Sequence, residues 1–483
     1  MSLRPSVVVV GGGIAGLAAA WELSGGAQGP DEHTARVEVI EQAERLGGAL
    51  LSVEFAGREI DLGPDGFLAR RPEGVTLARE LGLGDQLEGI GAVGASIWLK
   101  GALEDLPTGL VLGVPTDSKS VRAMKGLSWS SRWSAWRDEY APKKLNVTHD
   151  LSIGAILRTK LGSELTYQLI EPMVGGIQAG RVDELSAAAV FPALYEAAQR
   201  GGSLMKQLRS DAAPPTSPAT ERLLGPLFMS LQGGVGTLVR ELEHQLRARG
   251  VVIRTGAPVS ALRLTPSGTY PLEVDTADTA TGANEIILAT PAPVAGRLTH
   301  TLDESLSGLA SISSASTAMV TFVFDDPGAA LSARGTGVLI PLDTEWDDDI
   351  MLTTAITFLD RKWPYLKRDG EILLRAHVGR IDDRRSEVLG DDALIERVRR
   401  EIDTVLGVMG EPRAARVQRW PQGLAQYYVG HADLVAKARR LLEPHAIRLA
   451  GSPYDGVGVP ASIGSGRAAA RQAMEALDRS TQD

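Results

Sequence analysis

The sequence contains no cysteine among its 483 residues. Disulfides, thiol redox chemistry and cysteine-ligated metal sites are therefore excluded, and any electron transfer requires a bound cofactor. Long hydrophobic runs are also missing, because none reaches the roughly 18 apolar residues that a bilayer-spanning helix needs. The N-terminus leads directly into an apolar strand pattern, which leaves no room for a cleavable signal. We therefore expect a cytoplasmic protein.

Positive charge is not in excess either. The chain has 50 Lys and Arg against 60 Asp and Glu, a net charge of −10, which argues against a nucleic-acid partner. We find no close carboxylate pair, no Ser-His-Asp arrangement and no metal-ligand spacing, so we predict no metal site and assign no catalytic residue. Hydrophobic content of 43% and a length of 483 residues indicate an ordinary globular chain of two or three domains.

The clearest motif lies near the N-terminus. Residues 6–10 form a β-branched run that is typical of a buried parallel strand, and Gly11, Gly13 and Gly16 then fit the G-x-G-x-x-G spacing before a helical segment. In such a motif the glycines permit a tight turn, close approach of a pyrophosphate and close helix packing. Glu41 ends a second apolar strand, where an acid would hold a ribose. We predict a dinucleotide site here, the alternative being a turn that only joins strand to helix.

Two further glycine-containing turns follow. Gly47 and Gly48 come directly after Arg45 and Leu46, which indicates backbone that approaches something closely, although a plain type II turn is the alternative. Residues 63–66 (Gly-Pro-Asp-Gly) form another turn, and residues 70–71 are both arginines. An arginine pair would suit a ligand with carboxylates, or it forms a solvated surface.

Together these motifs resemble the flavoprotein superfamily of amine oxidases, phytoene desaturases and porphyrinogen oxidases. The G-P-D-x-F-L-x-R-R segment at 63–71 narrows the resemblance to the porphyrinogen oxidases. Residues 169–186 are similar to the L-I-E-P-x-x-x-G-I-x-A-G-x-x-x-x-L-S block of the bacterial members. The resemblance covers nearly the whole chain with its order preserved. Ala49 is a departure, because many relatives carry Lys or Arg there.

The resemblance implies FAD as the cofactor, without a separate nicotinamide site, since only one dinucleotide fingerprint is present. The implied FAD contacts are Gly11, Gly12, Gly13, Ile14, Ala15, Gly16, Glu41, Gln42, Arg45, Gly48, Ala49, Gly63, Pro64, Asp65, Gly66, Val259, Trp420, Val457, Gly458 and Val459. It also implies that the main chain at Gly176 faces a tetrapyrrole and that Leu339 presses on its ring. Arg70, Arg71 and Arg181 are our candidates for binding carboxylates of that ligand.

The expected fold class is α/β, with a Rossmann-like FAD-binding domain of the amine oxidase type, an α+β substrate domain and an inserted helical domain. A helix at 237–249 and strands at 251–253 and 285–291 return to the first sheet, whereas period-two alternation over 313–378 predicts an antiparallel sheet with one solvated face. The predicted domains are 1–90, 222–292 and 417–483 for FAD, 91–100 and 293–416 for substrate, and 101–212 for the helices, with a proline-rich linker at 213–218.

Three tryptophans stand apart from these motifs. Trp129, Trp133 and Trp136 recur at i, i+4 and i+7, on one face of a helix, and they are interleaved with the basic residues Lys125, Arg132 and Arg137. A basic aromatic helix can rest on a membrane surface or dock a partner. The interpretation that we favour is a stripe of core residues. Likewise, we expect His377 to be a structural histidine within a strand.

The function that the resemblance implies is oxygen-dependent oxidation of coproporphyrinogen III to coproporphyrin III in haem biosynthesis, with three molecules of oxygen reduced to hydrogen peroxide. The alternative is protoporphyrinogen IX oxidation, which differs in having two propionates on the substrate rather than four. A flavin amine oxidase or a carotenoid desaturase shares the N-terminal motifs but lacks the 171–186 block, and a flavin-free escort protein would not need the glycine pairs. The expected partners are the tetrapyrrole, molecular oxygen, transiently a ferrochelatase, and a membrane at most peripherally.

Overall fold

The structure is a computed structural model that describes residues 4–31, 35–107, 109–211, 226–265, 269–328, 331, 333–407 and 410–482. The chain forms two compact units, each of them discontinuous in sequence. Unit 1 comprises Met1–Gly89, Pro226–Ser313 and Ala432–Asp483, and unit 2 comprises Ile90–Gly225 and Ser314–His431. The segment predicted as a separate helical domain, 101–212, belongs to unit 2 together with the predicted substrate sheet. Residues 293–313, which were predicted to belong to the substrate domain, fall in unit 1, and residues 417–431, which were predicted to belong to the FAD domain, fall in unit 2. The predicted linker at 213–218 lies outside the described residues.

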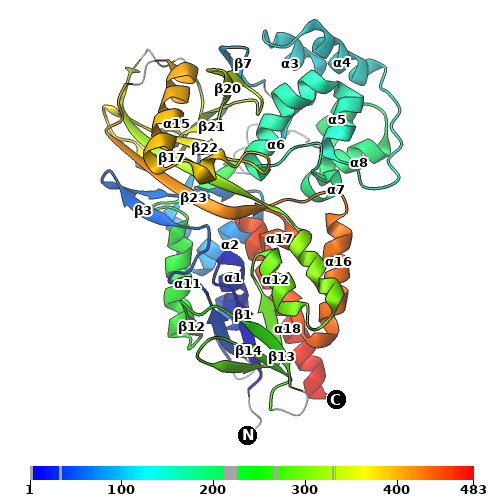
Figure 1. The fold of residues 1–483 in the computed structure, drawn as a ribbon, viewed down its shortest axis with the longest axis vertical. Coiled ribbons are helices and arrows are strands. Elements are labelled where there is room, and N and C mark those ends of the chain that lie inside the picture. Colours follow the sequence, from blue (N-terminus) through cyan, green and yellow to red (C-terminus); the bar gives the residue numbers. More distant parts are fainter. Residues whose placement is uncertain are drawn as a thin grey trace. The chain divides into compact units, whose positions relative to one another are not determined.

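Unit 1 is built on a five-stranded parallel sheet (Figure 1). In order across the sheet its strands are β12 (Val252–Arg254), β2 (Arg36–Ile40), β1 (Ser6–Val10), β16 (Glu285–Leu288) and β24 (Ile447–Leu449). Every residue of β1 is buried, as expected for a strand that is covered on both faces. The strands and the helix that we predicted for this part of the chain are confirmed within one to three residues at their ends.

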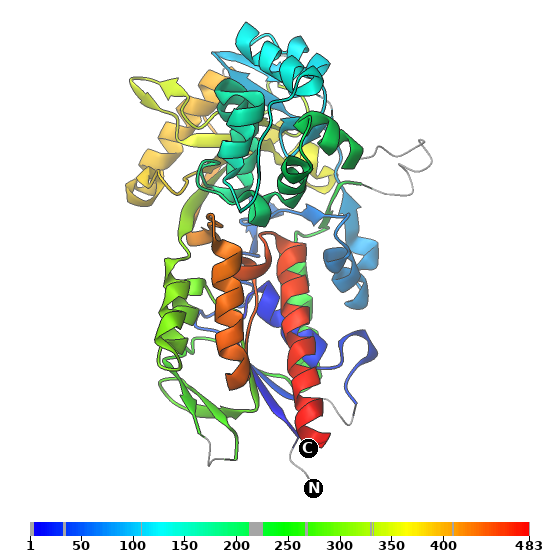
Figure 2. The same ribbon diagram turned by 90° about the vertical axis from the view of Figure 1, so that its right-hand side faces the viewer.

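Helices α1 (Ile14–Leu23), α11 (Gly236–Ala248) and α18 (Val459–Gln482) cover this sheet through a shared apolar core. Figure 2 shows α18, in red, running along the unit beside α16 (His431–Leu442). Glycines allow the start of α1 to lie close to the end of β1, because a Cβ on Gly16 would lie only 1.9 Å from the carbonyl oxygen of Gly11. In the same way, a Cβ on Gly466 of α18 would lie 1.9 Å from the carbonyl oxygen of Ala15. The start of α1 is therefore held closely between β1 and α18.

Smaller elements complete unit 1. They are the hairpin β3 (Ser52–Phe55) and β4 (Arg58–Asp61), the antiparallel set β5 (Phe67–Leu68), β11 (Phe228–Leu231) and β6 (Leu87–Gly89), the sheet of β13 (Ala261–Leu264), β14 (Leu272–Asp275) and β15 (Ala280–Ala283), and helices α2 (Pro72–Glu80), α12 (Ala292–Thr299) and α17 (Ser452–Asp455). At the start of α11, a carboxylate oxygen of Asp61 accepts the N–H of Val235 at 3.1 Å and so satisfies one N–H at that helix end.

Unit 2 contains a seven-stranded sheet in which only the β18 to β7 pair is parallel. Its strands, in order, are β23 (Ala414–Ala425), β17 (Ser314–Asp325), β22 (Glu371–Val378), β21 (Thr353–Phe358), β18 (Gly337–Leu339), β7 (Ser96–Leu99) and β8 (Ala102–Asp105). The predicted antiparallel sheet is confirmed. Its apolar face, which includes Phe322 and Leu374, packs against α15 (Asp391–Leu406). His377 shares the opposite face with Arg375 and pairs with Met319.

The helices between residues 118 and 211 surround a second apolar core of unit 2. They are α3 (Ser118–Ala123), α4 (Trp129–Tyr140), α5 (Ile153–Leu161), the π-helix η3 (Leu165–Ile170), α6 (Glu171–Gln178), α7 (Ala187–Val190), α8 (Pro192–Arg200) and α9 (Leu204–Asp211). The helical region begins later than predicted, because β8 and the short strands β9 (Leu110–Val111) and β10 (Val114–Pro115) precede α3.

The expectation that the tryptophan stripe belongs to the core is wrong. Trp129, Trp133 and Trp136 are 77%, 44% and 46% exposed, and Tyr140 continues the stripe at 59%. The three tryptophans do share one face of a helix, as their spacing predicts, but that face points outward. Among the described residues, no helix is both long enough and apolar enough to cross a membrane.

Candidate flavin and substrate site

A cavity of about 220 Å³ lies at the carboxyl ends of the parallel strands in unit 1. It is lined by Val10, Gly11, Gly13, Ile40, Glu41, Gln42, Gly48, Ala257, Val259, Ala289, Thr290, Pro291, Val294, Arg297 and Leu298. In the sheet β1 lies between β2 and β16, so the strand that follows β1 in the chain is on one side of it, and β16, which comes much later in the chain, is on the other. Ligands of open α/β sheets bind at this switch point, outside the carboxyl ends of the strands.

The first glycine loop has one position that must be glycine for the fold and one that leaves space for a ligand. Gly11 has φ +107°, and a Cβ there would lie 2.4 Å from the carbonyl oxygen of Ala289. A Cβ on Gly13 would meet nothing within 4 Å. Gly13 is also the N-cap of α1, whose start receives no side-chain cap. The uncapped N–H groups and the open space at Gly13 suit a pyrophosphate.

Glu41 is oriented by the main chain around it. Its Oε2 accepts the N–H of Gly12 at 2.6 Å, and its Oε1 accepts the N–H of Ala43 at 2.8 Å. A carboxylate has about four acceptor positions, so two remain for other donors. The side chain is therefore fixed at the cavity wall and can still accept hydroxyl groups.

The second glycine pair lies against the first glycine loop. The N–H of Gly47 donates to the carbonyl of Gly12 at 2.8 Å, and a Cβ on Gly48 would lie 3.4 Å from the Cα of Gly13. The prediction that this backbone makes a close approach is confirmed. Arg45 donates to the carbonyl of Gly48 at 2.7 Å, and burial lowers the pKa of its guanidinium.

Thr290 and Arg297 line the same cavity, although sequence reasoning did not single them out. Thr290 is 8% exposed, and its Oγ1 has no hydrogen-bond partner among the described residues. An unpartnered buried hydroxyl in a cavity wall is available to form a hydrogen bond with a bound group, and leaving it unsatisfied costs free energy. Val259, which we predicted, is also buried in this wall.

The loop before α18 supplies a second helix N-terminus in unit 1. Gly456 and Gly458 have φ values of +110° and +104°, and a Cβ on Gly458 would meet nothing within 4 Å. Next to this loop, Asp455 accepts two hydrogen bonds of 2.7 Å from Arg439 and one of 2.5 Å from Ser465. These bonds fix the loop that holds the predicted contacts from Val457 to Val459.

The residues of unit 1 therefore fit FAD. The open position at Gly13, the uncapped start of α1 and the unpartnered Thr290 hydroxyl each favour a bound group. Glu41, Gln42, Gly48 and Val259, which we predict to contact FAD, all line the cavity.

Arg70 and Arg71 lie elsewhere in unit 1. Both are exposed, and Arg71 is the N-cap residue of α2. Arg71 lines a groove of about 480 Å³ along α18, together with Glu73, Arg439 and Asp455. Neither arginine lines the cavity at the strand ends.

In unit 2, α6 presents two exposed residues near its C-terminal end, within the block at 169–186. Gly176 is exposed, a Cβ on it would meet nothing within 4 Å, and Ile177 is 46% exposed. The helix begins after the π-helix η3, and Pro172 stands in its first turn. A proline cannot donate an N–H, and π-helical turns are frequent at functional sites. An α6 surface without a Cβ at Gly176 would let a flat ligand approach the main chain.

Leu339 and Trp420 lie on the sheet of unit 2. Leu339, on β18, pairs with Ala355, and that row of paired residues continues through His377 and Met319 to Gln418 on β23. Residues that pair directly share one face of a sheet. Leu339 and His377 therefore lie on the face away from α15. His377 Nε2 lies 3.3 Å from Thr357 Oγ1.

Arg181 is surrounded by carboxylates of unit 2. Its two terminal nitrogens donate to Asp343 at 3.1 and 3.0 Å, and its Nε lies 3.1 Å from Glu171 Oε1. These acids raise the pKa of Arg181, with the hydrogen bonds to Asp343 as the largest cause. Glu171 is 1% exposed and also accepts the N–H of Val182 at 3.2 Å, while burial raises its pKa. The Arg181 guanidinium, which follows α6 in the chain, thus joins Glu171 at the start of that helix to Asp343.

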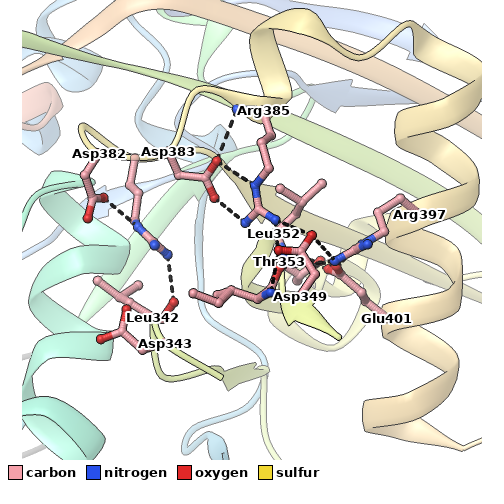
Figure 3. A network of polar contacts seen from close by, with 12 residues as sticks. Leu342, Asp343, Asp349, Leu352, Thr353, Asp382, Asp383, Arg385, Arg397 and Glu401 are labelled. Carbon is pink, nitrogen blue, oxygen red and sulfur yellow. Dashed lines mark hydrogen bonds and ion pairs between the residues drawn. The ribbon is translucent and has the colours of Figure 1, made fainter. Parts of the chain in front are cut away.

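The loop that carries Asp382 is held by a wider ionic network (Figure 3). Arg380 donates to the carbonyl of Leu342 at 2.8 Å and to Asp382 at 2.6 Å. The Arg385 guanidinium donates two hydrogen bonds to the Asp383 carboxylate, at 2.9 and 2.6 Å. Asp382 also lies 3.6 Å from a terminal nitrogen of Arg181, so this network adjoins the Arg181 cluster.

Fold and site together define a flavin-dependent oxidoreductase of two units. Residues 14–474 match the model of the family described as flavin containing amine oxidoreductase. The chain is 33% identical over 480 residues to the coproporphyrinogen III oxidase of Mycobacterium tuberculosis (strain ATCC 25618 / H37Rv), covering 98% of both chains. It is 31% identical over 482 residues to that of Bacillus subtilis (strain 168), covering 98% of this chain and 99% of the relative.

A crystal structure from Exiguobacterium sp. 255-15, which carries a provisional protoporphyrinogen oxidase name, superposes with a TM-score of 0.84. It is 29% identical and covers 99% of this chain and 100% of its own. The chain belongs to the flavin-containing amine oxidoreductases, and within them to the group that includes the bacterial coproporphyrinogen III oxidases. Its cofactor is FAD.

Proposed function

We propose that this protein oxidises coproporphyrinogen III to coproporphyrin III in haem biosynthesis, with oxygen as the acceptor. The relatives of about one third identity that match nearly the whole chain carry that activity in their names. The single structural observation that supports a tetrapyrrole is the exposed, Cβ-free surface at Gly176 on α6. Six electrons leave the substrate in three two-electron steps, and three molecules of oxygen become three of hydrogen peroxide.

FAD, when bound, supplies the two-electron acceptor, and the protein binds, orients and excludes water. We assign its binding to the residues predicted from the sequence, with Gly13 and the start of α1 at the pyrophosphate, Glu41 at the ribose and Val259 in the cavity wall. Thr290 joins this set through its unpartnered hydroxyl. Trp420 and residues 457–459 are proposed contacts of the flavin ring. The predicted division into three domains stays a proposal.

For the substrate we propose Gly176 and Leu339 as ring contacts and Arg70 and Arg71 as partners of the propionates. Both arginines are exposed, so their charges are available to an anionic ligand. Arg181 is already bonded to Asp343 and Glu171, so we assign it a positioning role at the end of α6. The cytoplasm is the proposed compartment, and a ferrochelatase that receives the product is a proposed transient partner.

The competing function is protoporphyrinogen IX oxidation, which the name of the Exiguobacterium structure favours. The two substrates are tested by adding each to the FAD-loaded protein in air while porphyrin fluorescence and peroxide are followed. We expect faster turnover of coproporphyrinogen III, and a preference for protoporphyrinogen IX would reverse the assignment. Arg71→Ala should raise KM for the four-propionate substrate more than for the two-propionate one. An unchanged KM for coproporphyrinogen III would remove Arg71 from the site.

A further inference from the structure

Residues 340–352 connect β18 to β21 in unit 2, and we call them the β18–β21 connection. The hairpin of β19 (Glu345–Trp346) and β20 (Asp349–Ile350) lies within it. The connection begins directly after Leu339 and ends directly before β21, the strand whose Ala355 pairs with Leu339. The strands at both of its ends therefore carry the row of residues that contains the proposed ring contact.

The start of the connection lies against α6. A Cβ on Gly175 would lie 3.3 Å from Cδ1 of Leu342, so the helix and the connection are close here. Gly176, the proposed ring contact on α6, is the next residue in the chain. Arg380 holds this part of the connection by donating to the carbonyl of Leu342 at 2.8 Å. The connection thus joins the row that contains Leu339 to the helix that carries Gly176.

The middle of the connection is held by two arginines (Figure 3). Arg385 donates to Oδ2 of Asp349 at 2.6 Å and to the carbonyl of Ile350 at 3.1 Å. Arg397, on α15, donates to the same two oxygens at 3.2 and 3.1 Å. Two guanidinium groups from different segments therefore bind adjacent residues of the hairpin and fix its place beside α15.

The end of the connection is held by a buried carboxylate, which Figure 3 also shows. Glu401 of α15 is 0% exposed, its Oε1 accepts the N–H of Leu352 at 2.9 Å, and its Oε2 accepts the N–H of Thr353 at 2.8 Å. Arg397 donates to Oε1 from its Nε at 2.7 Å. The other buried residues of α15 are Leu394, Val398, Ile402, Val405 and Leu406. Burying a charge among apolar side chains costs free energy unless hydrogen bonds satisfy it, and these three bonds do so.

Glu401 binds β21 at the point where the strand pairing is irregular. Thr353 and Ala355 pair with neighbouring residues of β22, so Thr354 between them is one extra residue and forms a β-bulge. The hydroxyl of Thr354 donates to the carbonyl of His377 at 3.1 Å. A bulge redirects the side chains that follow it in its strand. The first residue after this one is Ala355, the partner of Leu339.

We propose that Glu401 is a positioning residue for the tetrapyrrole, because it holds the β21 bulge and thereby fixes the row of Leu339 and Ala355 in relation to α6. This inference rests on the proposed function. A rigid, flat ring binds a preformed surface at lower cost than a mobile one, since no ordering of the protein then accompanies binding. Glu401 lies on the α15 side of the sheet, opposite to Leu339. It therefore acts on the shape of the binding surface and not by contact with the ligand.

Glu401→Gln tests the inference in the FAD-loaded full chain. The amide offers one acceptor oxygen and one donor nitrogen, so one N–H at the bulge loses its partner. The probe is coproporphyrin III, the proposed product, whose fluorescence reports its binding. We expect its Kd to rise about tenfold, whereas Kd for FAD, whose cavity lies in unit 1, should stay as in the wild type. The control is Glu396→Gln, because Glu396 is also an acid of α15 paired with an arginine but is 56% exposed.

Two further measurements separate positioning from stability. Hydrogen exchange over residues 340–355 reports the connection itself, and it should become faster in Glu401→Gln but not in Glu396→Gln. Arg397→Gln removes the cation that Glu401 and Asp349 share and leaves the two N–H bonds of Glu401 in place. It should raise Kd for coproporphyrin III by a smaller factor, and it decides the question if Glu401→Gln does not fold.

An unchanged porphyrin affinity in folded Glu401→Gln would overturn the inference even if exchange becomes faster, because Glu401 would then serve stability alone. Equal losses of porphyrin and FAD affinity would overturn it too, since the damage would then be general. If only Arg397→Gln folds, an unchanged Kd in that variant has the same consequence. A wild type that binds FAD but not coproporphyrin III would instead overturn the proposed function, and this inference with it.

Discussion

The main-chain N–H of Gly12 donates to Oε2 of Glu41 across 2.6 Å, so one hydrogen bond joins the glycine loop to the acid at the end of β2. The two features are separated in the sequence by the whole of α1 and meet because β1 and β2 are parallel neighbours. The acid is thereby placed at the cavity before any ligand arrives. Preorganisation of this kind lowers the cost of binding.

Glu41→Gln should therefore weaken FAD binding. The amide cannot accept hydrogen bonds through both of its terminal atoms, so either Gly12 or Ala43 loses its acceptor along with the negative charge. A charge-assisted hydrogen bond contributes about 1.5 kcal/mol or more, so we expect Kd for FAD to rise about tenfold. Titration of the apoprotein by flavin fluorescence measures this change. Glu44→Gln, an exposed acid three residues away, is the control, and equal affinities for the two variants would contradict the assignment.

Gly11 and Gly13 should fail in different ways when each is replaced by alanine. At Gly11, φ is +107° and a Cβ would lie 2.4 Å from a carbonyl oxygen, so Gly11→Ala should cost more than about 2 kcal/mol of unfolding free energy. At Gly13, φ is −70° and a Cβ would meet nothing, so Gly13→Ala should leave the apoprotein's stability nearly unchanged while reducing FAD affinity. Thermal melts of the apoproteins, paired with FAD titrations, separate the two. A Gly13→Ala protein that binds FAD normally would refute the pyrophosphate position.

These contrasts show what the sequence could predict. The strand, the three glycines and Glu41 obey local rules of spacing, so their structure could be predicted directly. Thr290 could not be found in this way, because it follows a strand that comes from far along the chain and belongs to no motif. The need for glycine at position 466 could not be predicted either, because it arises from packing against Ala15, which is far away in the sequence.

The tryptophan stripe shows a different limit. A period of 3.6 identifies one face of a helix but does not say whether that face turns inward or outward. The direction was decided by Asp138 on the opposite side of α4 and by its contacts with Ser203 and Met205. Those residues lie on other segments, and nothing in the local pattern of α4 reveals them.

Arg181→Ala should reduce stability more than a surface substitution does. It would leave the buried Glu171 without its cation and Asp343 without its bidentate partner. Breaking a buried ion pair from one side typically costs about 3 kcal/mol. Urea unfolding measures the loss, with Arg384→Ala as the control because Arg384 and its partner Glu387 are both exposed and lie only three residues apart. A stability loss no larger than that of the control would show that Arg181 does not hold the end of α6, and would make it a candidate propionate partner again.

Glu171→Gln should change how stability depends on pH. Burial raises the pKa of Glu171 above its ordinary value of 4.5, so its ionised form is disfavoured in the folded protein relative to the unfolded chain. Folding then carries no penalty from this group below pH 4.5, and the penalty grows as pH rises through the raised pKa. The glutamine has no charge to bury, so the melting temperature of the variant relative to the wild type should increase as pH rises from about 4.5 toward neutrality. Parallel melts across that range measure the difference. A difference that is constant with pH would mean that Arg181 compensates the Glu171 charge completely.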